Sequence, residues 1–597
     1  MTVENLKPRL ALRVGVTGHR QGRLDEADTG AIRSQIQNVL SRTAAVCENL
    51  ARTNTCYDDQ PPLLYFVSPV ADGTDAMAAE VALELGYKLL VPLPFSAAKV
   101  AQSFPDATRP RFDRLIARAD SVLELVPHAS DGQAEDEAYL EAGLATLRHA
   151  DVMISVWDGE AARGLGGTEM IVEAARDDGV PVVWIPLKTP DDVVILDGAD
   201  RTPYSDDGYE ALLDALLVLQ TDGQASPDAA DRFSSFLQEE KGGGWTPSFH
   251  SFVDKVLVGK WGKSRQHKPS AADNSLPHKD TEKTGAAAMV DHRYQHADEA
   301  AVRYGNVYRS SYYSNYFLSA AAVFLALLEV GLGMGKTLWI SLELAVIVVI
   351  LMTTVRGRKG RWHEKWLDYR QLTESLRRYV SVFAAGGALP FAHDEGHDRQ
   401  RSGETDWTRW YFRATVRELG MTGASLTPAF KRDLIQEVID KEIRPQIDYH
   451  TRNESNKHHL GHRLHKLGEY AFYGTLAVCV GYLLLVVLSK QEWAHWAYEL
   501  KKAVKGWVTV LTGFLPAFGA ALFGIRVQGE LGAIAKRSAS MASELRQTEA
   551  ALQRLLEQDD PDVGDMRRLI VRATSIALSE NAGWRSVYQY KPLDLPG

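Results

Sequence analysis

The sequence predicts an N-terminal α/β domain, a Rossmann-like fold with a doubly wound parallel sheet, followed by an all-α transmembrane domain with four spans. Short runs rich in Val, Leu and Ile alternate with helix-like periodicity over residues 8–190, which is typical of parallel βαβ units. The second half holds four apolar runs of about 20 residues, each long enough to cross a bilayer core of about 30 Å. The length of 597 residues exceeds that of one typical domain.

Six segments of the N-terminal part are predicted strands, because several are apolar without alternation, as strands buried on both faces are. They are RLALRVGVTG, LLYFVSP, KLLVPLPF, DSVLELV, DVMISVWDG and VPVVWIPL. The segments between them have an acidic or small residue near the start and often Gly after the end, which predicts helices. These are DEADTGAIRSQIQNVLSRTAAVCENLART, GTDAMAAEVALELG, DEAYLEAGLATLRHA and GGTEMIVEAARDDG.

The domain boundaries follow from shifts in composition. A polar, Pro-containing stretch at 262–285 is predicted to be a flexible linker. Polar helices frame each pair of apolar runs, and Tyr313, Tyr316 and Ala320 match Tyr470, Tyr473 and Ala477 at one offset, which favours duplication of a helix–span–span–helix unit. Chance similarity between apolar segments is the alternative. The predicted parts are an α/β domain at 1–225, a connector at 226–290, a first unit at 291–385 with spans at 313–333 and 337–355, and a second unit at 386–597 with spans at 469–488 and 507–526.

Charges flanking the spans predict the topology. Arg356, Arg358, Lys359 and Arg361 follow the second span, and the positive-inside rule places them in the cytosol. An even number of spans then leaves both termini cytosolic, in agreement with an N-terminus that lacks a signal-peptide pattern. The loop at 489–506 disagrees, because it is predicted to lie outside yet carries four lysines and two glutamates.

Composition excludes several classes of site. The net charge of −10 argues against a nucleic-acid-binding surface. Cys47, Cys56 and Cys479 have no metal-ligand spacing and fit a reducing compartment. His458, His462 and His465 fall on one helical face, which we interpret as a basic surface near lipid headgroups. We therefore predict no metal site and no resident cofactor.

The end of the first strand is the first candidate for a ligand site. In open α/β sheets, ligands bind at the carboxyl edge of the strands. Glycines there allow close backbone approach, a threonine can donate a hydrogen bond, and an arginine can bind a phosphate bidentately. A tight turn with a surface arginine is the alternative interpretation. The candidate residues are Gly15, Thr17, Gly18, His19 and Arg20.

Two predicted helix starts at the same edge strengthen this hypothesis. Helix N-termini offer unpaired N–H groups and a positive dipole end, which attract phosphate. Thr74 and Thr168 could also be simple N-caps. Asp72 and Asp75 would accept hydrogen bonds from ribose hydroxyls or a base edge rather than hold phosphate. The further candidate residues are Asp72, Gly73, Thr74 and Asp75 at one start, Gly166, Gly167, Thr168 and Glu169 at the other, and Trp157 and Asp158 at the end of the preceding strand.

The segments GVTGHR, SPVADGTDAMAAEVALELGYKLLVPLPF, DVMISVWDG and GGTEMIVEAAR together resemble the SLOG superfamily of Rossmann-like nucleotide-binding domains over residues 8–190. The helical half resembles the SLATT class of bacterial membrane effectors. The resemblance implies a sensor for a nucleotide second messenger, joined to an oligomeric effector in the bacterial inner membrane that permeabilises it during anti-phage defence. It also implies that an enzyme encoded nearby makes the signal.

An enzymatic function is the alternative. LOG-type nucleotide phosphoribohydrolases carry a Pro-Gly-Gly-x-Gly-Thr-x-x-Glu loop, whereas this chain has GLGGTEMIVE, without the proline and with shortened glycine spacing. Glu169 or Glu173 would then supply the acidic group. A third hypothesis is a nucleotide-regulated channel or transporter outside immunity. For the membrane pathway we single out Glu329 and Glu343, which are intramembrane carboxylates, and Pro516, which can kink the fourth span.

Overall fold

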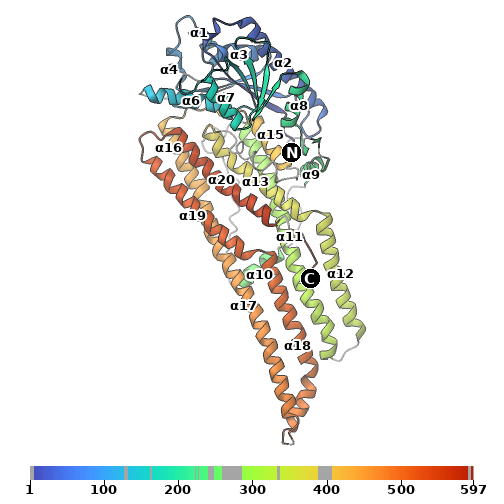
Figure 1. The fold of residues 1–597 in the computed structure, drawn as a ribbon. Helices are drawn as coiled ribbons and strands as arrows, with labels where there is room; N and C mark the ends of the chain where they lie inside the picture. Colours follow the sequence, from blue (N-terminus) through green and yellow to red (C-terminus); the bar gives the residue numbers. More distant parts are fainter. Residues whose placement is uncertain are drawn as a thin grey trace.

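The computed structural model describes residues 6–126, 132–161, 164–221, 224–225, 227–239, 248–258, 285–332, 336–387, 407–491, 493–588 and 593–595. The molecule is elongated, with an α/β domain at one end and long helices that extend from it (Figure 1). The predicted linker at 262–285 lies outside the described residues, except for Gly285.

One sheet of eight strands organises the α/β domain, in the order β4-β3-β2-β1-β5-β6-β7-β8. All neighbours from β4 to β6 are parallel, whereas β7 pairs antiparallel with β6 and with β8. The prediction of a mostly parallel sheet is confirmed, and the hairpin β7–β8 is an addition that the apolar runs did not indicate. The strands are β1 (Ala11–Gly18), β2 (Leu63–Val67), β3 (Lys88–Leu93), β4 (Ser121–Glu124), β5 (Val152–Trp157), β6 (Val182–Pro186), β7 (Val194–Asp197) and β8 (Asp200–Pro203).

Helices cover both faces of this sheet because the parallel strands are apolar on both sides. Leu12, Val14 and Val16 of β1 face a core shared with α2, α3 and α8. On the opposite face, Met153 of β5 packs with Ile171 of α7. The helices of this domain are α1 (Gln21–Leu24), α2 (Thr29–Thr53), α3 (Thr74–Glu84), α4 (Ala97–Gln102), α5 (Arg109–Ala117), α6 (Gly132–Arg148), α7 (Thr168–Asp177) and α8 (Asp206–Leu217).

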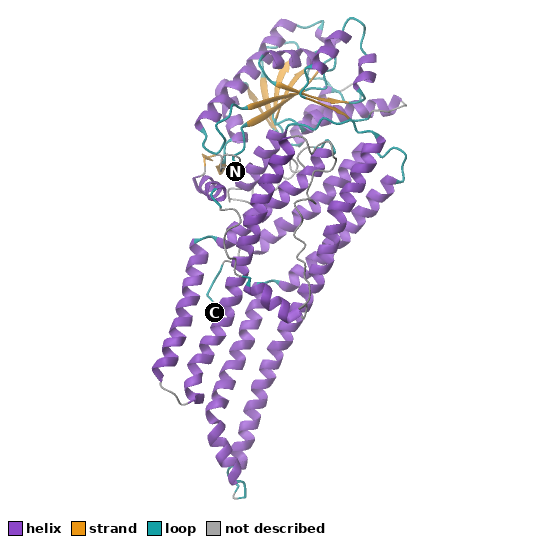
Figure 2. Cartoon of the chain, turned by 180° about the vertical axis from the view of Figure 1, so that it is seen from behind, coloured by secondary structure: helices purple, strands orange, loops and turns teal. Residues whose placement is uncertain are grey.

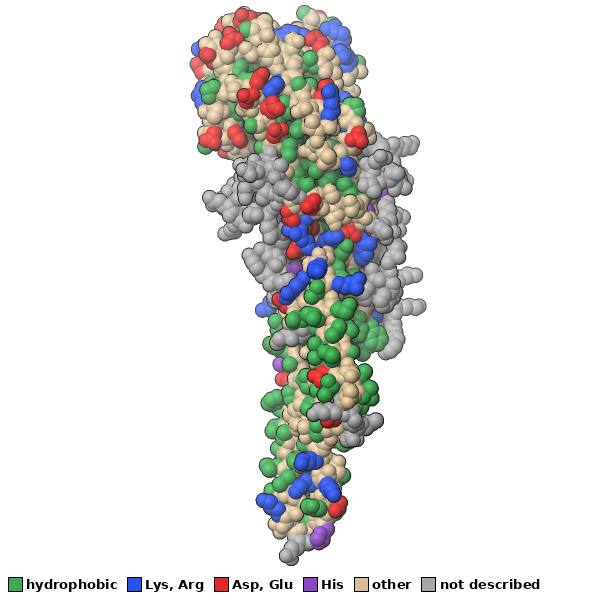
Figure 3. Space-filling model, turned by 90° about the vertical axis from the view of Figure 1, so that its right-hand side faces the viewer, with side chains coloured by type: hydrophobic (Ala, Val, Ile, Leu, Met, Phe, Trp, Pro, Cys, Tyr) green, Lys and Arg blue, Asp and Glu red, His purple; other side chains and the backbone are tan. Residues whose placement is uncertain are grey.

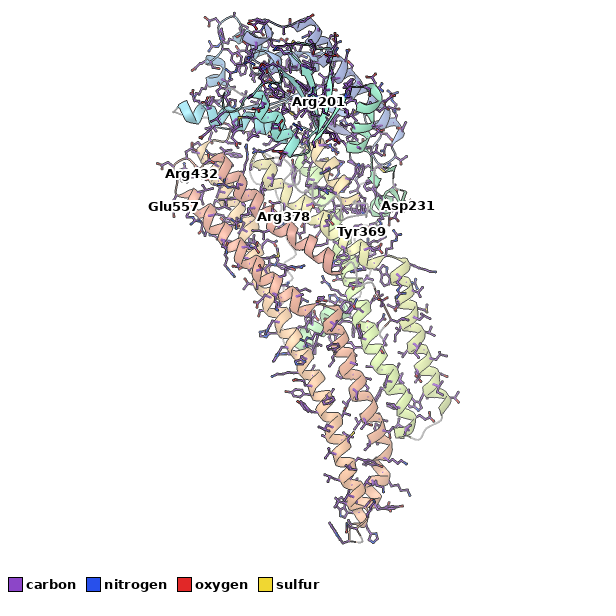
Figure 4. All side chains as sticks on the ribbon, in the orientation of Figure 1. Arg201, Asp231, Tyr369, Arg378, Arg432 and Glu557 are labelled. Atoms are coloured by element: carbon purple, nitrogen blue, oxygen red, sulfur yellow. The ribbon has the colours of Figure 1, made fainter. Side chains whose placement is uncertain are left out.

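A layer of helices that follow the α/β domain in the sequence lies directly beneath the sheet (Figure 2). Tyr369 and Arg378, both on α13, mark this layer in Figure 4. Its core is continuous with that of the α/β domain and runs from Leu6 to Ile576, so the predicted boundary at 225 does not separate two cores. The layer contains α9 (Pro227–Leu237), α13 (Trp362–Ala384), α15 (Trp407–Leu419), α16 (Pro428–Glu437) and α20 (Val563–Tyr588), with parts of α11 (Gly285–Leu332), α17 (Arg444–Leu488) and α19 (Leu531–Leu556).

The segment between α15 and α16 runs along the outer edge of β4. The N–H of Glu124 donates to the carbonyl oxygen of Ala424 at 2.8 Å, and the N–H of Leu426 donates to that of Glu124 at 2.9 Å. The hydroxyl of Ser121 also donates to the carbonyl oxygen of Met421 at 3.0 Å. An exposed strand edge is prone to pairing with other chains, and this segment covers it.

A buried ion triad fixes the sheet to the helical layer. Asp151, just before β5, accepts from Arg13 Nε of β1 at 3.2 Å and from Arg417 Nε of α15 at 2.9 Å. All three side chains are buried. Burial alone would raise the pKa of Asp151, but Arg13 and Arg417 hold it well below its ordinary value. The carboxylate is therefore ionised and joins the amino ends of two central strands to the helices below.

Within the described residues, four helices are long and apolar enough to cross a membrane. They are α11, α12 (Lys336–Lys359), α17 and α18 (His495–Gln528), and they contain the predicted spans, except that residue 333 lies outside the described residues. The helices form a row in the order α12, α11, α18, α17 (Figure 1). Hydrophobic side chains cover a long stretch of this row, with basic side chains gathered above and below it (Figure 3). α18 stays helical through Pro516.

The two predicted units share a series of elements, and the second also contains α15, α16 and α20. In each, a long polar helix continues into a first apolar helix, a second apolar helix returns, and another helix follows. A residue with left-handed backbone makes the last turn in both: Arg361, with φ of 49°, before α13, and Glu530, with φ of 45°, before α19. One difference is a π-helical segment, η3 (Val438–Ile443), which joins α16 to α17.

Candidate functional site

The carboxyl ends of β1 and β5 form the topological switch point of the sheet. From β1 the chain proceeds outward through β2, β3 and β4, and then returns to add β5 and β6 on the other side. Ligands of open α/β sheets bind outside the carboxyl ends of the strands at such a point. The N–H of His19 donates to the carbonyl oxygen of Val156 at 3.2 Å, so the residues after β1 stay next to β5.

A cluster of His19, Arg23 and Asp158 closes the junction between the two strands. His19 Nε2 lies 3.1 Å from a carboxylate oxygen of Asp158, and Arg23 forms an ion pair with the other oxygen. Burial alone would raise the pKa of Asp158, but the N–H of Glu160 and the neighbouring His19 and Arg23 lower it. Asp158 and His19 are therefore engaged with each other, and they support the edge rather than offer free groups to a ligand.

Among the residues that the structure describes, Arg20 is the cation at this edge that remains available. Its guanidinium lies over the ring of Tyr139 on α6, 5.4 Å from the centroid, and it pairs with no carboxylate of the described residues. Arg20 is exposed, whereas Arg23 next to it is occupied by Asp158. A cation–π contact of this kind orients a guanidinium without neutralising it. The charge can therefore meet an anion from solvent.

Tyr139 also adjoins the loop before α7. A Cβ on Gly166 would lie 3.0 Å from the backbone nitrogen of Leu140, and Gly166 has a φ of 76°, so glycine is required there for close approach to α6. Gly167 caps α7 without a side-chain hydrogen bond. Within the described part of the chain, the N–H groups of Thr168 and Met170 find no acceptor. The start of α7 thus presents unpaired donors close to the ring that holds Arg20.

The start of α3, in contrast, is used by the protein itself. Both the N–H and the hydroxyl of Thr74 donate to the carbonyl oxygen of His19, at 3.1 and 3.0 Å. A Cβ on Gly18 would lie 2.6 Å from the Thr74 side chain, and a Cβ on Gly73 would lie 2.6 Å from the backbone of Gln21. These three residues lock the turn after β1 against α3, so they shape the site without facing it.

Asp75 is a buried carboxyl in the first turn of α3. Only 8% of its surface is exposed, and its Oδ1 accepts no hydrogen bond from the described residues. Burial raises the pKa of Asp75 from 3.8 to about 7, against the opposing effect of Arg20. The preceding loop is held in place by Val70, whose φ of 49° is unusual for a β-branched residue. An unpartnered carboxyl beside a strained loop is a typical functional feature.

The raised pKa of Asp75 predicts a stability that depends on pH. The folded state keeps this proton up to about pH 7, whereas the unfolded chain releases it near 3.8, so stability falls as pH rises between those values. Asp75→Asn should remove a cost on the order of 4 kcal/mol above pH 7. We expect the melting temperature of the variant in detergent to exceed that of the wild type at pH 8 but not at pH 4.

Asp72→Asn, at a partly exposed position of the same loop, is the matched control for this measurement. If Asp75→Asn raised the melting temperature equally at pH 8 and at pH 4, this result would contradict a proton held on Asp75.

The other residues predicted for the ligand site differ in how close they lie to the carboxyl edge of the sheet. Gly15 is inside β1, packed on Met153, and does not reach the edge. Thr17 pairs in register with Ser155. The indole of Trp157 donates to the carbonyl oxygen of Glu160 at 2.8 Å. Glu173 is exposed and pairs with Arg176 at 2.9 Å, whereas Glu169 is in the first turn of α7. Asp72 is partly exposed in the loop before α3.

The residues singled out for a membrane pathway do not form one cluster. Glu329 and Glu343, on α11 and α12, are partly buried, whereas Pro516 is exposed on α18. In the row of four long helices, α12 lies at one end and is separated from α18 by α11.

Tyr139 is the site residue that the sequence analysis missed, because a tyrosine within a helix gives no signal of a contact with a distant strand end.

Comparison with known proteins adds no assignment to this geometry: no protein-family model matches the sequence, and no curated protein matches it.

Proposed function

We propose that this chain is a membrane-bound sensor whose α/β domain binds a nucleotide-derived ligand. The observation that carries the proposal is the unpaired Arg20, oriented by Tyr139 next to the open N-terminus of α7. An arginine and backbone N–H groups that converge at a switch point are the elements with which Rossmann-like folds bind phosphate. Asp75 supplies a carboxyl that could accept from a ribose hydroxyl or a base amine.

Two rigid connections support transmission of binding to the helical layer. Tyr139 lies on α6, and two residues further along Glu141 pairs with Arg567 of α20 at 3.0 Å. The second connection is the triad of Arg13, Asp151 and Arg417, at the opposite ends of the strands that flank the site. Ligand contacts that displace α6 or β5 would therefore act on the helices through two sets of ion pairs, of which the triad is buried and the Glu141–Arg567 pair is partly buried. Such a shift requires that the ligand prefer one of two states.

For the membrane half we propose insertion into the bacterial inner membrane, with both termini in the cytosol. The four long apolar helices and the basic residues at and just after the end of α12 support this topology. Together with the resemblance to SLOG and SLATT proteins, they favour an oligomeric effector that permeabilises the membrane once the nucleotide signal is bound, in antiviral defence. Dye entry into cells that express the full chain tests this step.

Arg20→Ala tests the ligand site directly. Loss of a charge-assisted hydrogen bond to phosphate costs about 1.5–3 kcal/mol, so we expect affinity to fall by about 10- to 100-fold. Inorganic pyrophosphate, ATP and ADP-ribose serve as probes for the full chain in detergent, with isothermal titration as the measurement. Arg52→Ala, an exposed arginine on α2, is the matched control and should bind like the wild type.

The outcomes separate the hypotheses. Wild-type chain that binds none of the probes, or Arg20→Ala that binds as tightly as the control, would refute a phosphate site at Arg20. Mass spectrometry of the bound nucleotide distinguishes a sensor from an enzyme. Intact ligand supports a sensor, whereas release of a free base supports glycosidic cleavage.

A further inference from the structure

We propose that α10 (Phe249–Val258) is a membrane-surface helix, which lies on the lipid headgroups with Phe249, Phe252 and Val256 inserted toward the acyl chains. This proposal rests on the membrane insertion of α11, α12, α17 and α18, and it adds a contact with lipid that does not span the bilayer. Neither the four apolar runs nor the α/β domain includes this helix.

One face of α10 is fixed to the long helices. Val253 is buried in a core with Tyr313 of α11 and Leu464 of α17. Polar contacts hold the same face: His250 Nδ1 lies 3.0 Å from the hydroxyl of Ser310, and the hydroxyl of Tyr313 donates to Asp254 at 2.7 Å. The helix therefore lies against α11 and α17 in a defined orientation.

The opposite face of α10 is apolar and open. Phe249, Phe252 and Val256 are 38%, 58% and 45% exposed. Their spacing of three and four residues puts them on one side of the helix, which is the pattern of an amphipathic segment with one buried and one exposed apolar side. An exposed row of this size on a soluble surface is unfavourable and indicates a partner.

The depth of α10 along the long helices identifies that partner as lipid. The ring of Phe249 lies 5.9 Å from that of Phe317, which is inside the first predicted span. On α17, Arg463 donates to the carbonyl oxygen of Leu257 and Leu464 shares a core with Val253, shortly before the apolar run that begins at 469. The exposed face of α10 is thus continuous with the apolar surface of the spans.

Charge around α10 fits an anionic lipid surface. Basic side chains near the headgroups of the cytosolic leaflet gain from its negative potential, by about 1 kcal/mol each. Short amphipathic helices that combine such cations with aromatic and aliphatic side chains lie in the plane of the interface. The exposed lysine and arginine residues at this level include Lys255 on α10, and Arg463 and Lys466 on α17.

Spin labelling of the full chain tests the proposal. In a background without Cys47, Cys56 and Cys479, a nitroxide is attached at Phe252→Cys, and the protein is reconstituted into vesicles of phosphatidylethanolamine and phosphatidylglycerol. Collision of the label with oxygen, which concentrates in the bilayer, is compared with collision with the water-soluble Ni(II)-EDDA. We expect a several-fold higher ratio of oxygen to nickel accessibility at Phe252→Cys than at Arg52→Cys on α2.

Val348→Cys on α12 separates the two proposals, because this side chain is exposed in the middle of a predicted span. A water-like ratio at Val348→Cys would overturn membrane insertion itself. A bilayer ratio at Val348→Cys with a water-like ratio at Phe252→Cys would overturn the role of α10 alone. Low collision with both reagents at Phe252→Cys would show that protein covers this position, and would likewise overturn the proposed contact of α10 with lipid.

Discussion

Asp151→Ala should lower the free energy of unfolding by about 3–5 kcal/mol, because it leaves two buried guanidinium groups without their shared carboxylate. Arg13 and Arg417 both bond Asp151, and neither side chain is exposed. The backbone N–H of Arg13 would also lose its acceptor, Asp151 Oδ2 at 3.0 Å. Thermal or chemical unfolding of the full chain in detergent, followed by tryptophan fluorescence, measures the loss.

A triple variant isolates the electrostatic part of this effect. Arg13→Met, Asp151→Leu and Arg417→Met together remove all three charges and keep much of the volume, and buried ion groups replaced in this way often cost little. We expect this variant to be more stable than Asp151→Ala. Asp113→Ala, at an exposed position of α5, is the control for the loss of an aspartate. If the triple variant were the least stable, packing rather than charge would explain the triad.

Valine at Gly506 and Gly524 should separate α11 from α18, the two central helices of the row. A Cβ at Gly506 would collide with the carbonyl oxygen of Val330, and one at Gly524 would collide with the ring of Tyr316. Small residues allow such close approach of apolar helices. Overpacking costs about 1–3 kcal/mol at each site, and sites this far apart should add. We expect the double variant to unfold at a clearly lower temperature in detergent.

Gly481→Val is the matched control, since it lies in the apolar part of α17 and a Cβ there would meet nothing within 4 Å. The control should unfold like the wild type. Equal destabilisation by Gly481→Val would point to a general effect of valine in these helices. An unchanged double variant would show that α11 and α18 are not packed as described.

The local sequence pattern was sufficient to predict most of the fold. Runs of buried apolar residues identified β1 to β6, and length with hydropathy identified the four long helices. The hairpin β7–β8 was missed because β8 is exposed along its whole length and has no apolar signal. The contact of Ala424 with β4 was missed for a different reason: 300 residues of chain separate these segments, and no periodicity reports pairing at that range.

The candidate site was predictable in its location and less so in the roles of its residues. Strand ends followed by glycine identified the correct edge of the sheet. Which side chains remain available to a ligand depends on contacts between segments that are distant in the sequence. Thr74 and Asp158 are engaged with His19, whereas Arg20 and Asp75 are not. Sequence alone cannot distinguish Arg20 from Arg23, because the difference lies in a carboxylate from another strand.

The uninterrupted course of α17 gives the protein a mechanical lever. Its 45 residues form one helix from the layer beneath the sheet to the far end of the row. At 1.5 Å per residue this is about 68 Å, so a tilt of about 5° at one end displaces the other by about 6 Å. The π-helical turns of η3 lie at the upper end, where such irregular segments often act as pivots. A small tilt beneath the sheet thus corresponds to a larger displacement at the far end of the row.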